Sequence, residues 1–275
     1  MADAQLLQRL VAQLQRRAQP SLPTNLVPLR IAGMQVGLAQ REVARFVAQN
    51  VAGFALIDRT LTLTNDAVDF EARTELLALA AQKLRAAGMI RGWRNEAMSV
   101  GEPAVATIER AACRPLGITT EAVHLNAYID TDVLIVARPA AHKQIDAGLW
   151  DNLVGGMVSA GETLDRTLQR EAWEEAGLRL DGIVLTRGRH FQMRRPVPEG
   201  LQSEIIHVYD VTLQSDTRLA NQDGEVDEIR RRSVSEVIEA IEHDEFTLES
   251  ALVTLESLTR SKENAASGFF KQPVH

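Results

Sequence analysis

The stretch Gly156-Met-Val-Ser-Ala-Gly-Glu-Thr-Leu-Asp-Arg-Thr-Leu-Gln-Arg-Glu-Ala-Trp-Glu-Glu-Ala-Gly-Leu178 contains most of the chemical information in this sequence. Residues 163–176 include neither Gly nor Pro, and Gly177 follows directly. Helix interiors disfavour Gly and Pro, whereas a left-handed C-terminal cap favours Gly. The pattern therefore predicts a helix over residues 163–176 that ends at Gly177. Its buried stripe is expected to consist of Leu164, Leu168 and Ala172.

Three glutamates share a second face of this predicted helix. Glu171, Glu174 and Glu175 are three and four residues apart, so their side chains are neighbours. Their charges repel one another, and a helix C-terminus disfavours anions, so a bound cation would relieve the conflict. Oxygen-only ligands favour Mg²⁺, with Mn²⁺ next. Arg170 is placed to orient one glutamate, and the alternative is an ordinary solvated acidic face.

The spacing of these residues resembles the Nudix box at all of its defining positions, which are Gly156, Glu162, Arg170, Glu171, Glu174, Glu175 and Gly177. This resemblance implies an α/β/α sandwich with a mixed sheet, a divalent metal, and hydrolysis of a diphosphate linked to another moiety. It also implies that the three helical glutamates are metal ligands and that Gly156 contributes its backbone carbonyl. Arg170 would orient a glutamate, and Glu162 would stabilise the loop or lie in the outer shell of ligands.

Composition restricts the class of protein. The chain has 275 residues, 45% of them hydrophobic, which indicates a globular protein. A net charge of −7 argues against non-specific binding to nucleic acid or to membranes. The single cysteine, Cys113, excludes an internal disulfide and is typical of a reducing cytoplasm. We expect Cys113 to be a packed thiol, with a nucleophile as the alternative. No apolar signal core or membrane-spanning stretch occurs, which predicts a cytoplasmic protein.

The pattern along the chain predicts three segments: an N-terminal α+β domain over residues 1–117, a Nudix domain over 118–262, and a loose tail over 263–275. The boundary is placed at Pro115-Leu116-Gly117. In the N-terminal part, we expect helices at 6–17, 41–50 and 71–87, a hairpin at 25–38 that turns at Ala32-Gly33, and strands at 54–63 and 97–100. In the Nudix part, we expect strands at 124–129, 133–137, 183–192 and 204–213, and helices at 234–241 and 248–259.

Four short motifs outside the box occur in a characteristic order. They are Trp93-Arg94-Asn95-Glu96, His124-Leu-Asn-Ala-Tyr128, Trp150-Asp-Asn-Leu-Val-Gly-Gly156 and Asp223-Gly-Glu-Val226. Together they resemble a two-domain group related to the Nudix portion associated with thiamine pyrophosphokinase in fungi. That resemblance implies hydrolysis of thiamine diphosphate, preferably its oxidised or damaged analogues, to the monophosphate and phosphate. Ala127 departs from the resembled motif, where Gly is expected.

Catalysis needs a group that takes a proton from water. Glu175 is the first choice for this base, and Glu225, in an Asp-Gly-Glu turn beyond the box, is the second. Glu204 is expected to be structural or to complete the metal shell. Candidates for substrate binding are Arg187 and Arg189, from a run that also contains Arg194 and Arg195, together with Trp93 and Arg94.

Other functions remain open at this stage. An ADP-sugar or a dinucleotide is the main alternative substrate. A Nudix-fold isomerase would need a catalytic cysteine and a degraded box, and a non-catalytic Nudix module would lack box glutamates, whereas all of them are present. The resemblance favours a homodimer, and the expected partner is a small-molecule diphosphate rather than nucleic acid or membrane.

Overall fold

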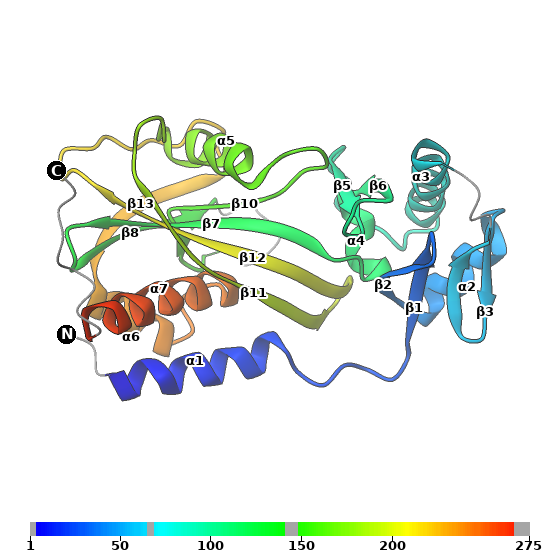
Figure 1. Ribbon diagram of the computed structural model, residues 1–275, viewed down its shortest axis with the longest axis horizontal. Coiled ribbons are helices and arrows are strands. Elements are labelled where there is room, and N and C mark those ends of the chain that lie inside the picture. Colours follow the sequence, from blue (N-terminus) through cyan, green and yellow to red (C-terminus); the bar gives the residue numbers. More distant parts are fainter. Residues whose placement is uncertain (1–3, 65–68, 141–147, 267–275) are drawn as a thin grey trace.

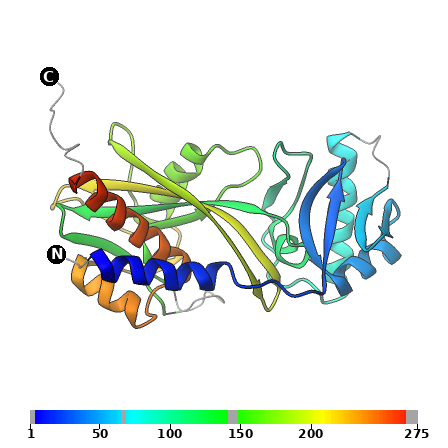
Figure 2. The same cartoon turned by 60° about the horizontal axis from the view of Figure 1, so that its bottom comes forward.

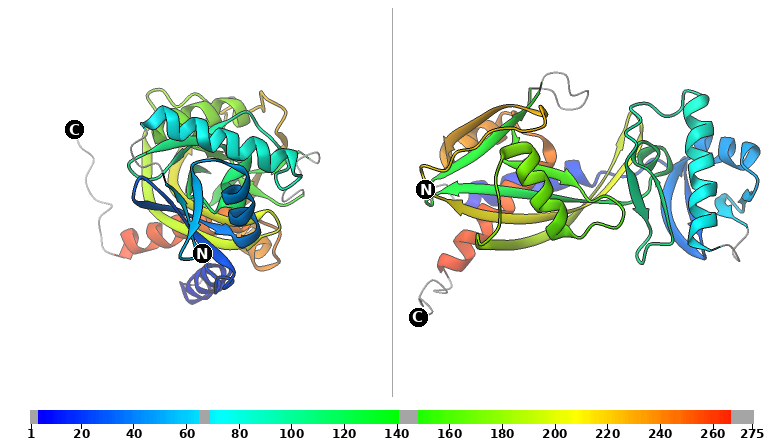
Figure 3. Two further views of the ribbon diagram at one scale, coloured as in Figure 1. Left: turned by 90° about the vertical axis from the view of Figure 1, so that its right-hand side faces the viewer. Right: turned by 90° about the horizontal axis from the view of Figure 1, so that it is seen from above.

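The computed structural model describes residues 4–64, 69–140 and 148–266, and these form two parts that lie side by side along the long axis (Figures 1 and 3). The larger part is built on a seven-stranded sheet. Its main path runs β11 (Leu185–Val197), β12 (Gly200–Leu213), β7 (Thr120–Ile129), β8 (Val133–Pro139) and β13 (Val226–Ser233). Two short strands, β9 (Asp151–Asn152) and β10 (Val154–Met157), pair with β8 and β7 respectively.

This sheet is mixed and covered on both faces. Strands β7 and β12 are parallel, whereas β7–β8, β8–β13, β11–β12 and β7–β10 are antiparallel. One face packs against α5 (Leu164–Ala176), and the other against α6 (Val234–Glu242) and α7 (Leu248–Ala266). Because both faces are covered, almost every residue of β7 is buried, rather than every second one. The predicted α/β/α sandwich with a mixed sheet is confirmed.

The first helix lies on the larger part although it precedes the smaller part in the sequence. Helix α1 (Ala4–Ala18) buries Leu7, Leu10 and Leu14 in the same core as α6 and α7. Figure 2 shows α1 alongside α7, with an extended segment leading away to the smaller part. The predicted division of the chain at residue 117 stays a prediction. Within the described segments, no helix has both the length and the apolar character that a membrane span requires.

The smaller part is an α+β unit, as expected. Its four-stranded sheet has the order β2 (Met34–Gln40), β1 (Leu26–Ile31), β4 (Thr60–Leu63) and β3 (Phe54–Ile57). Helices α2 (Arg41–Asn50) and α3 (Phe70–Ala86) pack on this sheet and share its core. A hairpin of β5 (Ala97–Val100) and β6 (Ala106–Glu109) leads into the short helix α4 (Arg110–Leu116), which faces the larger part.

Some local predictions are corrected by the structure. The expected single strand over 54–63 is a hairpin, because Asp58 and Arg59 adopt left-handed backbone conformations with φ of 46° and 62°. Strand β13 was not predicted, since it is an edge strand that is partly exposed on both faces and shows no regular alternation. Helix α7 continues to Ala266, so the first residues of the predicted loose tail are helical, and residues 267–275 lie outside the described residues.

The C-terminus of α4 packs closely against β2 at Gly117. This glycine caps α4 in a left-handed conformation with φ of 59°, and its carbonyl accepts a hydrogen bond of 3.1 Å from the N–H of Leu38. A Cβ at residue 117 would lie 2.0 Å from the carbonyl oxygen of Leu38. The backbone of β2 therefore approaches this position so closely that only glycine fits.

The first prediction concerns this junction. We expect Gly117→Ala to lower the free energy of unfolding by about 2 kcal/mol or more, because it adds a steric clash to left-handed strain. Gly33→Ala is the matched control, since Gly33 also has positive φ, at 74°, but nothing lies within 4 Å of its Cβ position. Urea unfolding of both variants measures the difference. Equal losses would show that the contact with Leu38 does not matter.

Candidate active site

A cavity of about 460 Å³ lies where α5, β7, β10 and the smaller part meet. It is rich in carboxylates and contains three arginines. The lining residues used below are Glu96, Arg110, Arg114, His124, Gly155, Gly156, Met157, Ser159, Arg170, Glu171, Glu174, Glu175, Gln202, Glu204, Asp223, Glu225 and Glu249. The three glutamates predicted on one helix face are therefore brought together here with Gly156, Arg170 and Glu225.

Helix α5 forms as the sequence predicts. The side chain of Thr163 accepts a hydrogen bond from the backbone N–H of Arg166, which caps the N-terminus. Gly177 ends the helix in a left-handed conformation with φ of 62°. Leu168 and Ala172 are buried against the sheet, which turns the glutamate face towards the cavity.

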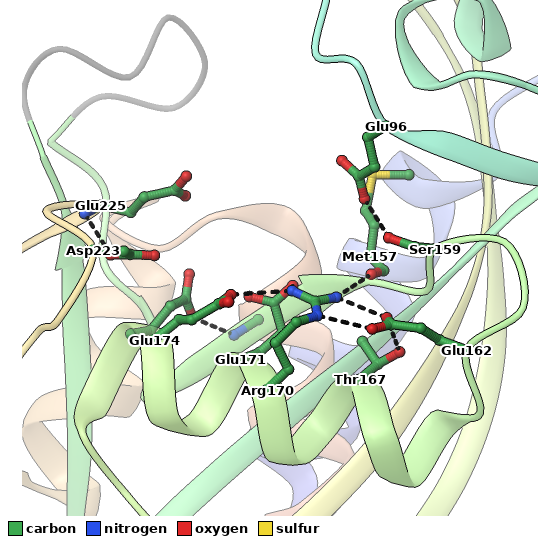
Figure 4. A network of polar contacts seen from close by, with 12 residues as sticks. Glu96, Met157, Ser159, Glu162, Thr167, Arg170, Glu171, Glu174, Asp223 and Glu225 are labelled. Carbon is green, nitrogen blue, oxygen red and sulfur yellow. Dashed lines mark hydrogen bonds and ion pairs between the residues drawn. The ribbon is translucent and has the colours of Figure 1, made fainter.

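Arg170 is the centre of the polar contacts in the cavity (Figure 4). Its guanidinium donates to Glu171 at 2.8 Å and to Glu174 at 3.1 Å. It also donates to both carboxylate oxygens of Glu162, at 3.0 and 2.9 Å, and to the carbonyl of Met157 at 3.4 Å. The sequence predicted one glutamate partner on the helix, whereas the structure shows two.

These contacts alter the acidity of the groups around Arg170. Its hydrogen bonds hold the pKa of Glu162 below the usual value, and Glu162 in turn raises the pKa of Arg170. Burial raises the pKa of Glu171 to about 7, and the nearby charges of Glu174 and Glu225 add to this effect while Arg170 opposes it. Burial is therefore the main cause of the raised pKa of Glu171, and the neighbouring carboxylates have a smaller effect.

The glycine pair in β10 allows the sheet and helix to approach each other closely. A Cβ at Gly156 would lie 2.0 Å from Cδ of Glu171, so no larger residue fits there. The backbone N–H of Gly155 donates to Oε2 of Glu175 at 2.9 Å, and Glu175 is only 7% exposed. This backbone contact fixes the most buried of the three helical carboxylates.

The donor atoms fit a hard divalent cation. Carboxylate oxygens of Glu171, Glu174 and Glu175 and the carbonyl of Gly156 are the oxygen ligands that Mg²⁺ and Mn²⁺ take. Over residues 4–64, 69–140 and 148–266, however, no three acidic, His or Cys side chains are arranged as a formed metal site. Glu171 and Glu174 each contact Arg170 through one carboxylate oxygen, Oε1 and Oε2 respectively.

Two acidic residues lie on the opposite side of the cavity from α5. Figure 4 shows Glu225 and Asp223 on the segment before β13, facing Glu174 across open space. The backbone N–H of Glu225 donates to Oδ1 of Asp223 at 2.8 Å, which fixes the turn. The structure therefore brings the second candidate base to the same cavity as the box glutamates.

Sequence reasoning missed the polar residues beneath the cavity. His124 lines it, and its Nδ1 lies 2.9 Å from Oδ1 of Asn152. Asn152 donates to Asn126 at 2.8 Å, and Asn126 donates to Asp210 at 2.9 Å. This buried chain of hydrogen bonds fixes the base of the site. Its signal in the sequence is the pair of polar residues His124 and Asn126 within an otherwise apolar strand.

Glu204 also lines the cavity, together with Glu249. Burial raises the pKa of Glu204, and the charge of Glu249 adds to this effect. Gln202 donates to both carboxylates, at 3.3 Å to Glu204 and 2.8 Å to Glu249. The structural role expected for Glu204 and its alternative role in a metal shell both stay predictions.

The structure places the four predicted substrate-binding residues outside the lining of this cavity. Arg189 lies next to a different cavity between α1, β11 and α7, where it donates to Glu263 at 2.6 Å. Arg187 lies on β11, close enough to Tyr209 for its charge to lower the pKa of that phenol, which burial raises.

The other two substrate-binding candidates, Trp93 and Arg94, belong to the smaller part. Trp93 donates to Asn95 at 2.9 Å, and the guanidinium of Arg85 lies 4.7 Å from its ring centroid. Arg94 is exposed, and its backbone N–H donates to Glu109. The arginines that do line the cavity from this part are Arg110 and Arg114, which the sequence did not single out.

Cys113 is a packed residue and does not line the cavity. It is 3% exposed in the core of the smaller part, and burial raises the pKa of its thiol to about 12. A thiol with such a pKa holds very little of the reactive thiolate near neutral pH.

We therefore expect Cys113 to react with dithionitrobenzoate at pH 8 at least 100-fold more slowly in the native protein than in 6 M urea. Unfolding restores the ordinary pKa of a cysteine, near 8.5, and also exposes the sulfur. The release of coloured thiolate measures the rate. Fast modification of the native protein would contradict the buried position.

Comparison with known proteins assigns both parts of the chain. Residues 120–251 match the family described as NUDIX domain, and residues 7–120 match the family described as Domain of unknown function (DUF4743). Nudix hydrolase 24, chloroplastic, from Arabidopsis thaliana is 31% identical over 209 residues, which cover 69% of this chain and 54% of that protein. Nudix hydrolase 20, chloroplastic, from the same plant is 28% identical over 187 residues, which cover 64% of this chain and 49% of that protein.

The chain thus spans about half the length of these two relatives. Among solved structures, DR0079 from Deinococcus radiodurans matches with a TM-score of 0.47 at 20% identity, and the match covers 61% of this chain and 98% of that one.

Proposed function

Since the chain belongs to the Nudix superfamily through residues 120–251, we propose that it is a metal-dependent hydrolase that cleaves a diphosphate linkage. One observation carries the proposal: the acidic face of α5, the glycine strand β10 and Glu225 all face one cavity. A non-catalytic Nudix module is the alternative, and the complete set of box glutamates argues against it.

The residues that would hold the cation are Glu171, Glu174, Glu175 and the carbonyl of Gly156. A bound Mg²⁺ or Mn²⁺ would offset the negative charge of the diphosphate and polarise the bond that breaks. Arg170 positions the glutamates before the cation arrives, because it holds Glu171 and Glu174 on one side of the helix. Gly156 keeps the backbone within reach of Glu171.

A carboxylate in the same cavity would take a proton from the attacking water. Glu175 is the first candidate, although the N–H of Gly155 stabilises its charged form. Glu225 is the second candidate, because it faces α5 from the other side of the cavity. Glu225→Gln separates the two: a large loss of turnover with unchanged metal affinity assigns the proton transfer to Glu225.

The metal site gives a direct prediction. We expect Glu174→Gln and Glu175→Gln to lower turnover by about 10²-fold or more, because each removes a charge at nearly constant volume. Asp165→Asn is the matched control, since Asp165 is an exposed acid on the same helix and does not line the cavity. Calorimetric titration with Mn²⁺ provides a second measurement, in which both glutamine variants bind more weakly. Near-wild-type rates in both would contradict the metal site.

The substrate that we propose is thiamine diphosphate or one of its oxidised analogues. The support is the order of the four flanking motifs, each of which contributes at least one residue to the cavity lining: Glu96, His124, Gly155 and Asp223. The second candidate is a nucleoside-diphosphate compound, an ADP-sugar or a dinucleotide. Both classes of substrate contain a diphosphate, which the acidic site would bind together with its cation.

Product analysis with Mg²⁺ decides between these substrates. We expect thiamine diphosphate, and oxidised analogues more strongly, to give the monophosphate and inorganic phosphate at higher kcat/KM than ADP-ribose gives AMP and ribose phosphate. A panel of these compounds assayed side by side by chromatography measures the ratio. Preference for the nucleotides would retain the metal chemistry and reject the thiamine assignment.

Three further statements stay predictions. The net charge of −7 supports a small-molecule partner rather than nucleic acid or a membrane surface. We propose a cytoplasmic location from the single buried cysteine. A homodimer is proposed from the family resemblance, and light scattering of the purified protein tests it.

A further inference from the structure

The cavity with the box glutamates has a second wall that comes from the smaller part of the chain. Glu96, Arg110 and Arg114 line the same cavity as Glu171, Glu174 and Glu175. These three residues precede the Nudix match at residues 120–251 and lie within the match to the domain of unknown function at residues 7–120. The site is therefore composite within one chain.

The two arginines project from one face of α4. They are four residues apart, so their side chains are neighbours along the helix. The other face carries Ala112, Cys113 and Leu116, which are buried in the core of the smaller part. Burial of that apolar face leaves the arginine face directed into the cavity.

Close backbone contacts fix α4 on both sides. At its C-terminus, Gly117 contacts Leu38 of β2, within the smaller part. At the turn between β11 and β12, a Cβ at Gly200 would lie 2.1 Å from the carbonyl oxygen of Arg114, so that turn packs directly on the helix. The backbone of α4, from which both arginines project, is thus held between β2 and the turn that joins β11 to β12.

Arg110 and Arg114 can bind an anion, whereas Arg170 has no donor left for one. All five N–H groups of Arg170 are used by Glu162, Glu171, Glu174 and Met157. Arg110 donates to Glu96 at 2.8 Å through one terminal nitrogen. Arg114 lies 3.6 Å from Glu199, in a partly exposed and weak ion pair. Each of these guanidinium groups has five donors, and within the described segments most of them remain for an anion.

The smaller part also holds the loop of the Nudix box. Glu96 accepts a hydrogen bond of 2.8 Å from Ser159 with the carboxylate oxygen that does not contact Arg110. The backbone N–H of Ala160 donates to the carbonyl of Ala97 at 2.8 Å. The loop that leads from β10 to α5 is therefore attached to the same unit that carries the arginines (Figure 4).

We propose that Arg110 and Arg114 form the anion-binding wall of the active site, so that the domain of unknown function recognises the phosphoryl oxygens of the substrate that the cation does not hold. This inference rests on the proposed function, because it assumes that a diphosphate occupies the cavity. It assigns to the smaller part a role in substrate binding and leaves the chemistry to the Nudix part.

Arg114→Gln is the decisive variant, because Arg114 does not contact the loop through Glu96. We expect its KM for the diphosphate substrate to rise about tenfold or more with kcat changed less than threefold, as for the loss of a charge-assisted hydrogen bond made in both ground and transition states. The double variant, which combines Arg114→Gln with Arg110→Gln, should show a larger rise in KM. Binding of methylenediphosphonate, a diphosphate analogue that is not hydrolysed, should weaken by a similar factor in calorimetry with Mg²⁺ present.

Two control variants separate binding from structure. Glu199→Gln breaks the same ion pair but keeps the arginine, and Glu199 does not line the cavity. Arg45→Gln removes an exposed arginine from helix α2 of the same part. Both should retain wild-type KM and wild-type affinity for the analogue.

The outcomes distinguish this inference from the proposed function. If the wild type hydrolyses no diphosphate, the proposed function fails, and analogue binding still reports on the arginines. If Arg114→Gln and the double variant bind the analogue and turn over substrate like the wild type, the anion-binding wall is rejected. It is also rejected if Glu199→Gln reproduces the loss seen in Arg114→Gln.

Discussion

The site depends on the five hydrogen bonds of one guanidinium group. Arg170 connects Glu162 of the loop and the carbonyl of Met157, at the end of β10, to Glu171 and Glu174 of the helix. Without it, the acidic face of α5 would consist of like charges held close together, which burial makes more costly. Burial raises the pKa of Glu171 to about 7, and the charges of Glu174 and Glu225 add to this effect while Arg170 opposes it. A second positive charge, from a cation, would complete the balance.

Close packing of the backbone sets the positions of β10, α5 and α4 around the cavity. Gly156 allows β10 to approach α5, and Gly117 and Gly200 allow α4 to approach the strands beside it. Each is a position where a Cβ would lie about 2 Å from another atom, well inside van der Waals contact. The cavity therefore has two walls, one acidic and one carrying arginines, and Glu96 connects them through Ser159 and Arg110. A diphosphate with its cation needs both kinds of charge.

The local features of the site were predictable from sequence because they depend on residues close together in the chain. Helix α5, its Thr163 and Gly177 ends and its glutamate face follow from propensity, capping and three- and four-residue spacing. The hairpin of β1 and β2 follows from its turn in the same way. Strand β13 did not follow, because an edge strand that is partly exposed on both faces has no clear period. The hairpin of β3 and β4 was missed because its left-handed turn is formed by Asp58 and Arg59 without a glycine.

The sequence by itself determined the family of the larger part, the carboxylates of the site and the helix that presents them, since these lie within twenty-three consecutive residues. Only the tertiary structure decided which distant residues join them. It placed Glu225 opposite α5, put His124 at the base of the cavity, and left Arg187, Arg189, Trp93 and Arg94 outside its lining. It brought in Arg110 and Arg114 instead, because the approach of α4 to the strands around it is set by backbone contacts that no local pattern encodes.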